Sequence, residues 1–136
     1  MEHDEFIGQV QARARLDSRG AAEQATRATL ETLGERLSEG AAENLAAQLP
    51  HEIGEHLRRT ASGTGERLDL GDFFARVTER SGTGVDEPAA VFHARCVLEV
   101  VDEATSGNLM GKLREQLPAE YDRLFSAGSK GRMPGA

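Results

Sequence analysis

Apolar residues recur at helical spacing along almost the whole chain, and no run alternates between apolar and polar residues as a half-buried strand would. The pattern predicts an all-α fold of about eight helices. Ser, Asp or Pro stands near the start of most of them, where a side-chain oxygen or a missing N–H suits a helix N-terminus. The predicted helices span about 3–14, 20–37, 39–49, 50–59, 70–80, 88–104, 106–117 and 118–125.

The second half of the chain repeats the first. Residues 21–57 align with residues 89–125 at a constant offset of 68, and twelve of the 37 positions are identical. An offset of 67 extends the match upstream, where it aligns Arg13 with Arg80. We interpret this as a tandem duplication of a four-helix unit, folded as one pseudo-twofold helical domain. The expected boundaries are 1–126 for the domain, 3–59 and 69–125 for the repeats, 60–68 for a linker and 127–136 for a flexible tail.

Composition narrows the classes of partner. The net charge of −7 disfavours nucleic acid and anionic membrane surfaces, which both require clustered cations. No apolar run is long enough to span a membrane, and no apolar segment follows the first residues, so we expect a cytoplasmic protein. The single cysteine, Cys96, excludes an intrachain disulfide and any multi-cysteine metal site.

A charged stripe is the most notable feature that both repeats keep. Its members are four residues apart, so each set lies on one helix face, away from the apolar face. Three interpretations remain open: solvated i,i+4 ion pairs, a pseudo-twofold contact that pairs Arg27 with Glu99 and Arg95 with Glu31, or a duplicated docking face for a partner. The stripe consists of Arg27, Glu31 and Glu35 in the first repeat and Arg95, Glu99 and Glu103 in the second.

A second candidate site lies on the helix predicted at 88–104. Phe92, His93 and Cys96 stand where the first repeat has Gln24, Ala25 and Ala28, so they could line a pocket at the repeat junction. A His–Cys pair three residues apart could also activate a thiolate. Packing of a small apolar cysteine between helices is the commoner explanation.

The remaining motifs favour structural roles. His51 and His56 are five residues apart and should diverge on a helix, unlike the i,i+4 histidines of zinc proteases. The Ser-Gly-Thr-Gly strings at 62–65 and 81–84 lack the ending of a phosphate loop. We therefore expect no catalytic residues, no metal and no cofactor.

Three segments carry a resemblance to a known family. They are Asp4-Glu5-Phe6, the Ala-Thr-Leu-Glu-Thr-Leu-Gly-Glu-Arg-Leu string at 28–37 and the Ala-Ala-Gln-Leu-Pro string at 46–50. On these segments the chain, over about 3–126, resembles the bacterial family called domain of unknown function 2267. The resemblance implies an all-helical fold and brings no established catalytic residues.

These observations together favour a non-enzymatic helical module that binds a protein partner or a second copy of itself. The alternative is a small-ligand or stress-related binding protein with its pocket near His93. An enclosed cavity at His93 would favour the alternative, and tight packing there would favour the first hypothesis.

Overall fold

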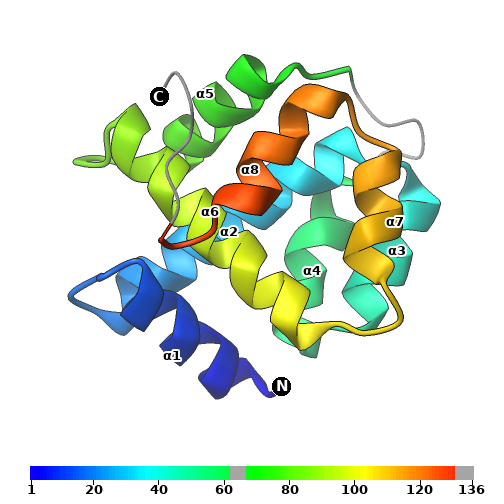
Figure 1. The fold of residues 1–136 in the computed structure, drawn as a ribbon. Helices are drawn as coiled ribbons and strands as arrows, with labels where there is room; N and C mark the ends of the chain where they lie inside the picture. The colour runs from blue at the N-terminus through cyan, green and yellow to red at the C-terminus, as the bar shows by residue number, and fades with distance from the viewer. Residues whose placement is uncertain (62–66, 131–136) are drawn as a thin grey trace.

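Two long helices, α2 (Arg19–Arg36) and α6 (Glu87–Ala104), cross near the middle of the structure, with α1 and α5 on opposite sides of the crossing (Figure 1). The structure is a computed structural model that describes residues 1–61 and 67–130. Within these ranges it contains eight α-helices, one short 3-10 helix and no strand, so the all-α prediction is confirmed. The other elements are α1 (His3–Arg13), α3 (Glu39–Ala47), α4 (His51–Thr60), α5 (Leu70–Ser81), α7 (Leu109–Glu115), η1 (Ala119–Tyr121) and α8 (Asp122–Ala127).

Side-chain caps begin the long helices where the sequence predicts them. The hydroxyl of Ser18 accepts a hydrogen bond from the Ala21 N–H at 3.1 Å, and Asp86 accepts one from the Ala89 N–H at 3.0 Å. Such a contact satisfies one of the free N–H groups of the first turn. Both caps are followed by a helix of 18 residues, so the two long helices begin and end at the same offset of 68. The common origin of the halves remains an inference from the sequence.

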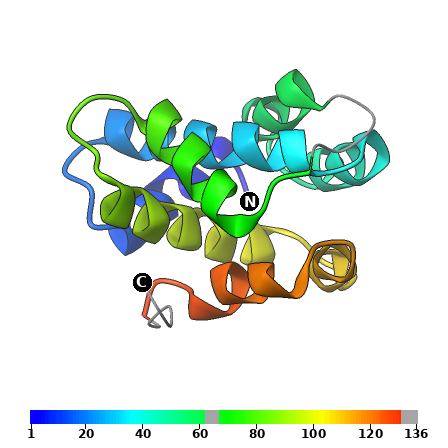
Figure 2. The ribbon, with the colours of Figure 1, turned by 90° about the horizontal axis from the view of Figure 1, so that it is seen from above.

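Each long helix packs against the first helix of both halves. α1 and α5 both contact α2 and α6, and α2 also contacts α4, while α8 lies on the face of α6 away from α2 (Figure 2). α2 is therefore buried on most of its circumference, which explains its small Ala, Thr and Gly residues. The core is one continuous cluster that includes Phe6 of α1 and Phe73 of α5, both completely buried.

Two glycines permit the close approach of α4 to its neighbours. A Cβ on Gly54 would lie 2.7 Å from the Ala46 carbonyl oxygen of α3, and one on Gly34 of α2 would collide with Thr60 and the Leu57 backbone of α4. No side chain fits at either contact. Gly54 thus serves packing, although on helix propensity alone it only weakens α4.

The second half departs from the predicted boundaries. α7 begins three residues after Ser106, because Gly107 and Asn108 form a turn with φ values of 68° and 57°. The helix predicted from 118 starts as the 3-10 helix η1 and continues as α8. The beginning of the expected tail is packed, since Gly128 is buried and the Ser129 N–H donates to Glu99. Of the linker and tail, residues 62–66 and 131–136 lie outside the described ranges.

Candidate functional site

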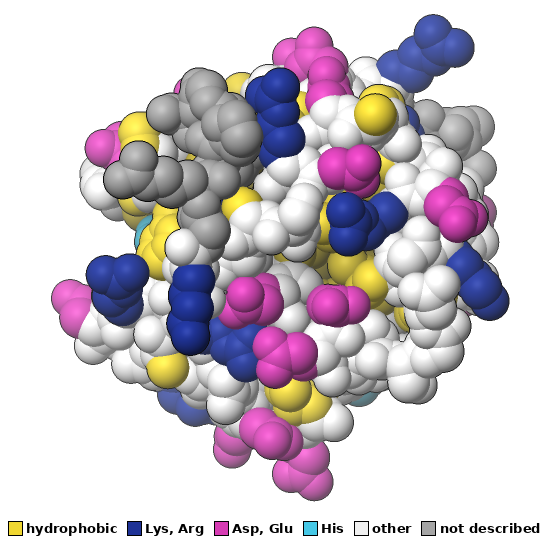
Figure 3. Space-filling model, in the orientation of Figure 1, with side chains coloured by type: hydrophobic (Ala, Val, Ile, Leu, Met, Phe, Trp, Pro, Cys, Tyr) yellow, Lys and Arg dark blue, Asp and Glu magenta, His cyan; other side chains and the backbone are white. Residues whose placement is uncertain are grey.

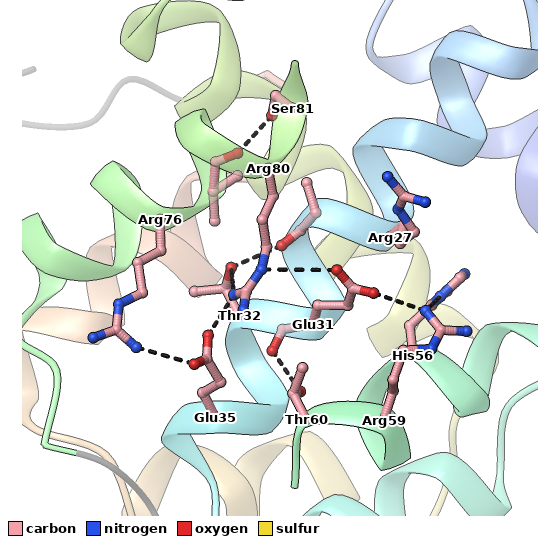
Figure 4. A network of polar contacts seen from close by, with 12 residues as sticks. Arg27, Glu31, Thr32, Glu35, His56, Arg59, Thr60, Arg76, Arg80 and Ser81 are labelled. Atoms are coloured by element: carbon pink, nitrogen blue, oxygen red, sulfur yellow. Dashed lines mark hydrogen bonds and ion pairs between the residues drawn. The ribbon is translucent and has the colours of Figure 1, made fainter.

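The glutamates of the predicted stripe bind arginines that come from other helices. In the first half, the carboxylates of Glu31 and Glu35 on α2 both pair with Arg80 of α5 (Figure 4). The Arg80 guanidinium also donates to the Thr32 hydroxyl at 2.8 Å. Arg76, one turn earlier on α5, pairs with Glu35 at 3.1 Å. The side chains of Glu31 and Glu35 are only 16% and 20% exposed, so these contacts are partly shielded from water.

The second half contains the reciprocal arrangement. Arg13 of α1 pairs with Glu99 of α6 at 2.9 Å and also with Glu103. Burial alone would raise the pKa of Glu99, but hydrogen bonds from Ser129 and Arg13 outweigh it and the pKa lies below its usual range. The hydrogen bond from Arg13 likewise lowers the pKa of Glu103. Arg13 and Arg80 are the residues that the offset of 67 aligns, so each half supplies an arginine to the long helix of the other.

These contacts bear on the interpretations of the stripe. Within residues 1–61 and 67–130, Arg27 forms no ion pair, so it joins neither Glu31 nor Glu99. Arg95 is 9% exposed and its Nε–H donates to the Gly128 carbonyl at 3.0 Å. The predicted pairs are thus replaced by pairs with α1, α4 and α5. A docking role for the stripe stays a prediction.

In the second candidate set, Cys96 packs in the core and Phe92 contacts two arginines. Cys96 is fully buried, and burial raises the pKa of its thiol to about 11, which keeps it protonated at neutral pH. Burial lowers the pKa of His93. Phe92 is half-buried between the guanidinium groups of Arg15 and Arg95, each 5.7 Å from its ring centroid. The arrangement fits packing rather than an activated nucleophile.

A different surface forms a groove, between α1, α2 and α4. Its volume is about 560 Å³, within the range of ligand sites, and neither Phe92, His93 nor Cys96 lines it. Two buried isoleucines, Ile7 and Ile53, form its floor. Gly20 and a set of charged and polar side chains surround them: His3, Glu23, Gln24, Arg27, His51, Glu52, Glu55, His56 and Arg59.

Histidines concentrate in this groove. His3, His51 and His56 line it, although His51 and His56 were expected to diverge on their helix. Both nevertheless line it, and His51 is 77% exposed. The offsets that align the repeats match His3 with Leu70, His51 with Ala119 and His56 with Leu124 in the second half. Two of these counterparts, Leu70 and Leu124, are buried core residues, so the first half has imidazoles where the second half has apolar side chains.

The electrostatic environment of His56 is cationic. Burial lowers the pKa of His56, and the nearby guanidinium of Arg59 lowers it further. Arg27 and His3 act in the same direction, while Glu31 opposes them. The Arg59 Nη1 lies 3.2 Å from His56 Nδ1 and donates to Glu31 at 2.7 Å. The imidazole is thus neutral at neutral pH and faces two arginines.

Metal or acid–base chemistry finds no support among these groups. In the part of the chain that the structure describes, no three His, Cys, Asp or Glu side chains are grouped so that they could hold a metal ion. The groove carboxylate Glu55 is engaged by Arg58 at 2.9 Å rather than held in an apolar setting. The groove is lined instead by hydrogen-bonding and charged side chains above two isoleucines.

Sequence reasoning missed the groove because its residues come from three helices that are far apart in the chain. His3 attracts no attention in sequence, and Arg59 lies outside the aligned repeat. One signal was present: three of the four histidines fall in the first half, where the second has Leu or Ala.

The face shown in Figure 3 carries acidic and basic side chains side by side, with hydrophobic surface in separate small areas. Met1 is the one large hydrophobic residue that is exposed in the described ranges. None of the helices in those ranges is both long and apolar enough to cross a bilayer.

The architecture is that of an all-helical protein with a polar groove and no recognisable catalytic centre in its described part. Comparison with known families places residues 3–124 in the family described as uncharacterized conserved protein (DUF2267). Because the match covers most of the chain, the protein belongs to this family, as the sequence motifs predicted. No curated protein matches the chain.

Proposed function

We propose that the protein is a non-enzymatic, cytoplasmic protein-interaction module and that a partner protein docks in the groove between α1, α2 and α4. The observation that carries the proposal is the gathering of His3, His51 and His56 with two arginines around one open groove. Polar side chains at positions where the other half has apolar ones weaken packing, so a role in recognition explains them better.

The groove supports this function better than the other candidate surfaces. The glutamates of the stripe already bind Arg13, Arg76 and Arg80 within the chain, which leaves them less free to recognise a partner. Cys96 is inaccessible, and Phe92 is covered by two guanidinium groups, so a ligand pocket at the repeat junction has less support. A hydrophobic homodimer has little exposed apolar surface to use in the described ranges.

Site-specific photo-crosslinking tests the proposal in cells that produce the protein. A benzoylphenylalanine replaces Glu23, an exposed residue at the groove rim, or Glu115, an exposed residue of α7 outside the groove. We expect a protein adduct from the position of Glu23 that is absent from the position of Glu115. The crosslinked protein is identified by mass spectrometry, and its binding is reproduced with purified proteins. The same adducts from both positions, or none from the position of Glu23, would refute the assignment of the groove.

A further inference from the structure

We propose that the occupant of the groove is an extended peptide segment of the partner carrying one acidic residue, whose carboxylate is bound by Arg27 and Arg59. This inference rests on the function proposed above and adds the chemistry of recognition. Three independent features support it. Arg27 at the rim of the groove is oriented by a hydrogen bond and has no ion pair within the described residues, a second arginine lies beside it, and a segment of the chain itself contacts the aligned arginine in the second half.

Arg27 is oriented but not neutralised. The Gln24 side chain donates to the Arg80 carbonyl oxygen at 2.6 Å, which fixes its amide, and its oxygen accepts from Arg27 Nη2 at 3.3 Å. Arg27 is exposed and has no ion pair in the described ranges, so most of its donors face water. A planar guanidinium presented in this way suits a carboxylate, which it can bind through two parallel hydrogen bonds.

Arg59 extends the positive region across the groove, with the neutral His56 imidazole beside it. Figure 4 shows Arg27, His56 and Arg59 together on the side of Glu31 that faces away from Arg80. One Arg59 nitrogen is occupied by Glu31, but the side chain is 52% exposed. A carboxylate placed here would meet two exposed arginines beside the isoleucine floor.

The second half shows what can lie at such a position. Arg95, which aligns with Arg27, donates to the main-chain carbonyl of Gly128, and Glu99 accepts from the Ser129 main-chain N–H. The chain's own peptide thus lies along α6 beside the aligned arginine. The first half has its arginine at an open groove instead, so a peptide from a partner is the occupant that matches this internal example.

The carboxylates of the rim restrict the sequence of the peptide. Glu23 and Glu52 are exposed at the groove and would repel a run of acidic residues. They favour neutral or basic residues on either side of the single acidic one. The inference is therefore a short peptide with one Asp or Glu, not a polyacidic segment.

The site also predicts a pH dependence. His56 is faced by Arg59 from its own helix, by Arg27 and Glu31 from α2, and by His3 from α1. A bound carboxylate would favour protonated His56, so the complex takes up a proton as it forms. Because the pKa of His56 in the free protein lies below the ordinary histidine value of about 6.5, affinity should increase as the pH falls below neutrality toward that lowered pKa.

The test uses the purified full-length chain and a displayed library of random 12-residue peptides. The most enriched peptide is synthesised with a fluorophore and titrated by anisotropy, together with a copy in which its acidic residue is replaced by the amide. We expect enriched peptides with a single conserved Asp or Glu. Loss of that carboxylate, or Arg27→Gln or Arg59→Gln, should weaken binding about 10- to 100-fold, as expected for a hydrogen bond between charged groups.

Arg123→Gln is the matched control, because Arg123 is exposed and forms no ion pair with the rest of the described chain. Circular dichroism and thermal unfolding verify that each variant is folded. His56→Gln should remove the increase in affinity at low pH. Inorganic phosphate is titrated in parallel, and its binding in the absence of any peptide binding would show a small-anion site instead.

Four outcomes would overturn the inference: enriched peptides without an acidic residue, no enriched peptide, equal binding by Arg27→Gln and the control, or an affinity that does not rise at low pH. These outcomes are separate from failure of the proposed function. If the position of Glu23 gives the crosslink and the peptide experiment gives one of these four outcomes, the groove remains a docking site. Only its preference for a carboxylate is then rejected.

Discussion

Removal of the Arg80 side-chain charge tests whether the ion pairs between the halves stabilise the fold. Arg80→Met keeps most of the aliphatic side chain and removes the contacts to Glu31, Glu35 and Thr32. The remaining groups are not left alone, since Glu31 keeps Arg59, Glu35 keeps Arg76 and the Thr32 hydroxyl donates to the Ala28 carbonyl. The cost should therefore be smaller than that of an orphaned buried charge.

The magnitude follows from burial and the number of contacts. Hydrogen bonds to charged groups contribute about 1.5–3 kcal/mol each when shielded, and the retained partners reduce the loss. We expect Arg80→Met to lower the free energy of unfolding by about 1–2 kcal/mol. An unfolding entropy of about 2.1 cal/mol/K per residue then gives a Tm lower by about 3–7 °C.

Urea unfolding and thermal unfolding of the variant provide the measurement. Arg123→Met is the control, since an exposed arginine without an ion pair in the described chain should change stability by less than about 0.5 kcal/mol. A double-mutant cycle with Glu35→Gln should give a coupling energy of about 1 kcal/mol. Equal stability of Arg80→Met and Arg123→Met, or zero coupling, would refute the claim that this contact holds α5 to α2.

Three further perturbations follow from the structure. Gly54→Ala should lower the free energy of unfolding, measured in urea, by about 1–3 kcal/mol because the new methyl group meets the α3 backbone. Gly8→Ala is the control: the space around Gly8 is open, so this variant should be as stable as the parent protein or more stable. Iodoacetamide should label Cys96 very slowly in the native protein and rapidly in urea, since the thiol is buried with a pKa near 11; rapid native labelling would disprove its burial. Arg13 lowers the pKa of Glu103, so the ion pair between them stabilises the fold fully above about pH 4.3, the pKa of Glu in the unfolded chain. This stabilisation is lost as the pH falls through the lower pKa of Glu103 in the folded protein. Arg13→Met should therefore make the free energy of unfolding depend less steeply on pH in the acid range.

Much of the fold could be predicted from the chain alone. The apolar spacing indicated the helices, and Ser or Asp was expected near the start of most of them. In the structure Ser18, Ser38 and Asp69 accept hydrogen bonds from the first turns of α2, α3 and α5. The start of α7 was misplaced, because the left-handed turn at Gly107 and Asn108 moves the helix past Ser106. Such a turn depends on backbone conformation that the residue order only weakly indicates.

The candidate site was predicted less well. The sequence identified the repeated glutamates but left their partners open among three interpretations. The arginines that they contact, Arg13, Arg76 and Arg80, are brought to them by the packing of α1 and α5. Arg13 and Glu103 are 90 residues apart, and nothing local relates them. The groove was missed for the same reason, since His3 and Arg59 are joined only when α1 and α4 lie beside α2.

By itself, the sequence determined the helices, their caps and the likeness of the two halves, because these depend on residues within one or two helical turns and on alignment of the chain with itself. The tertiary structure decided which charges meet, which histidines share a groove and which arginine has no ion pair within the described residues. Those relations require helices far apart in the chain to come within a few ångströms, and charge–charge contacts and hydrogen bonds are sensitive to that distance and to the water that packing excludes.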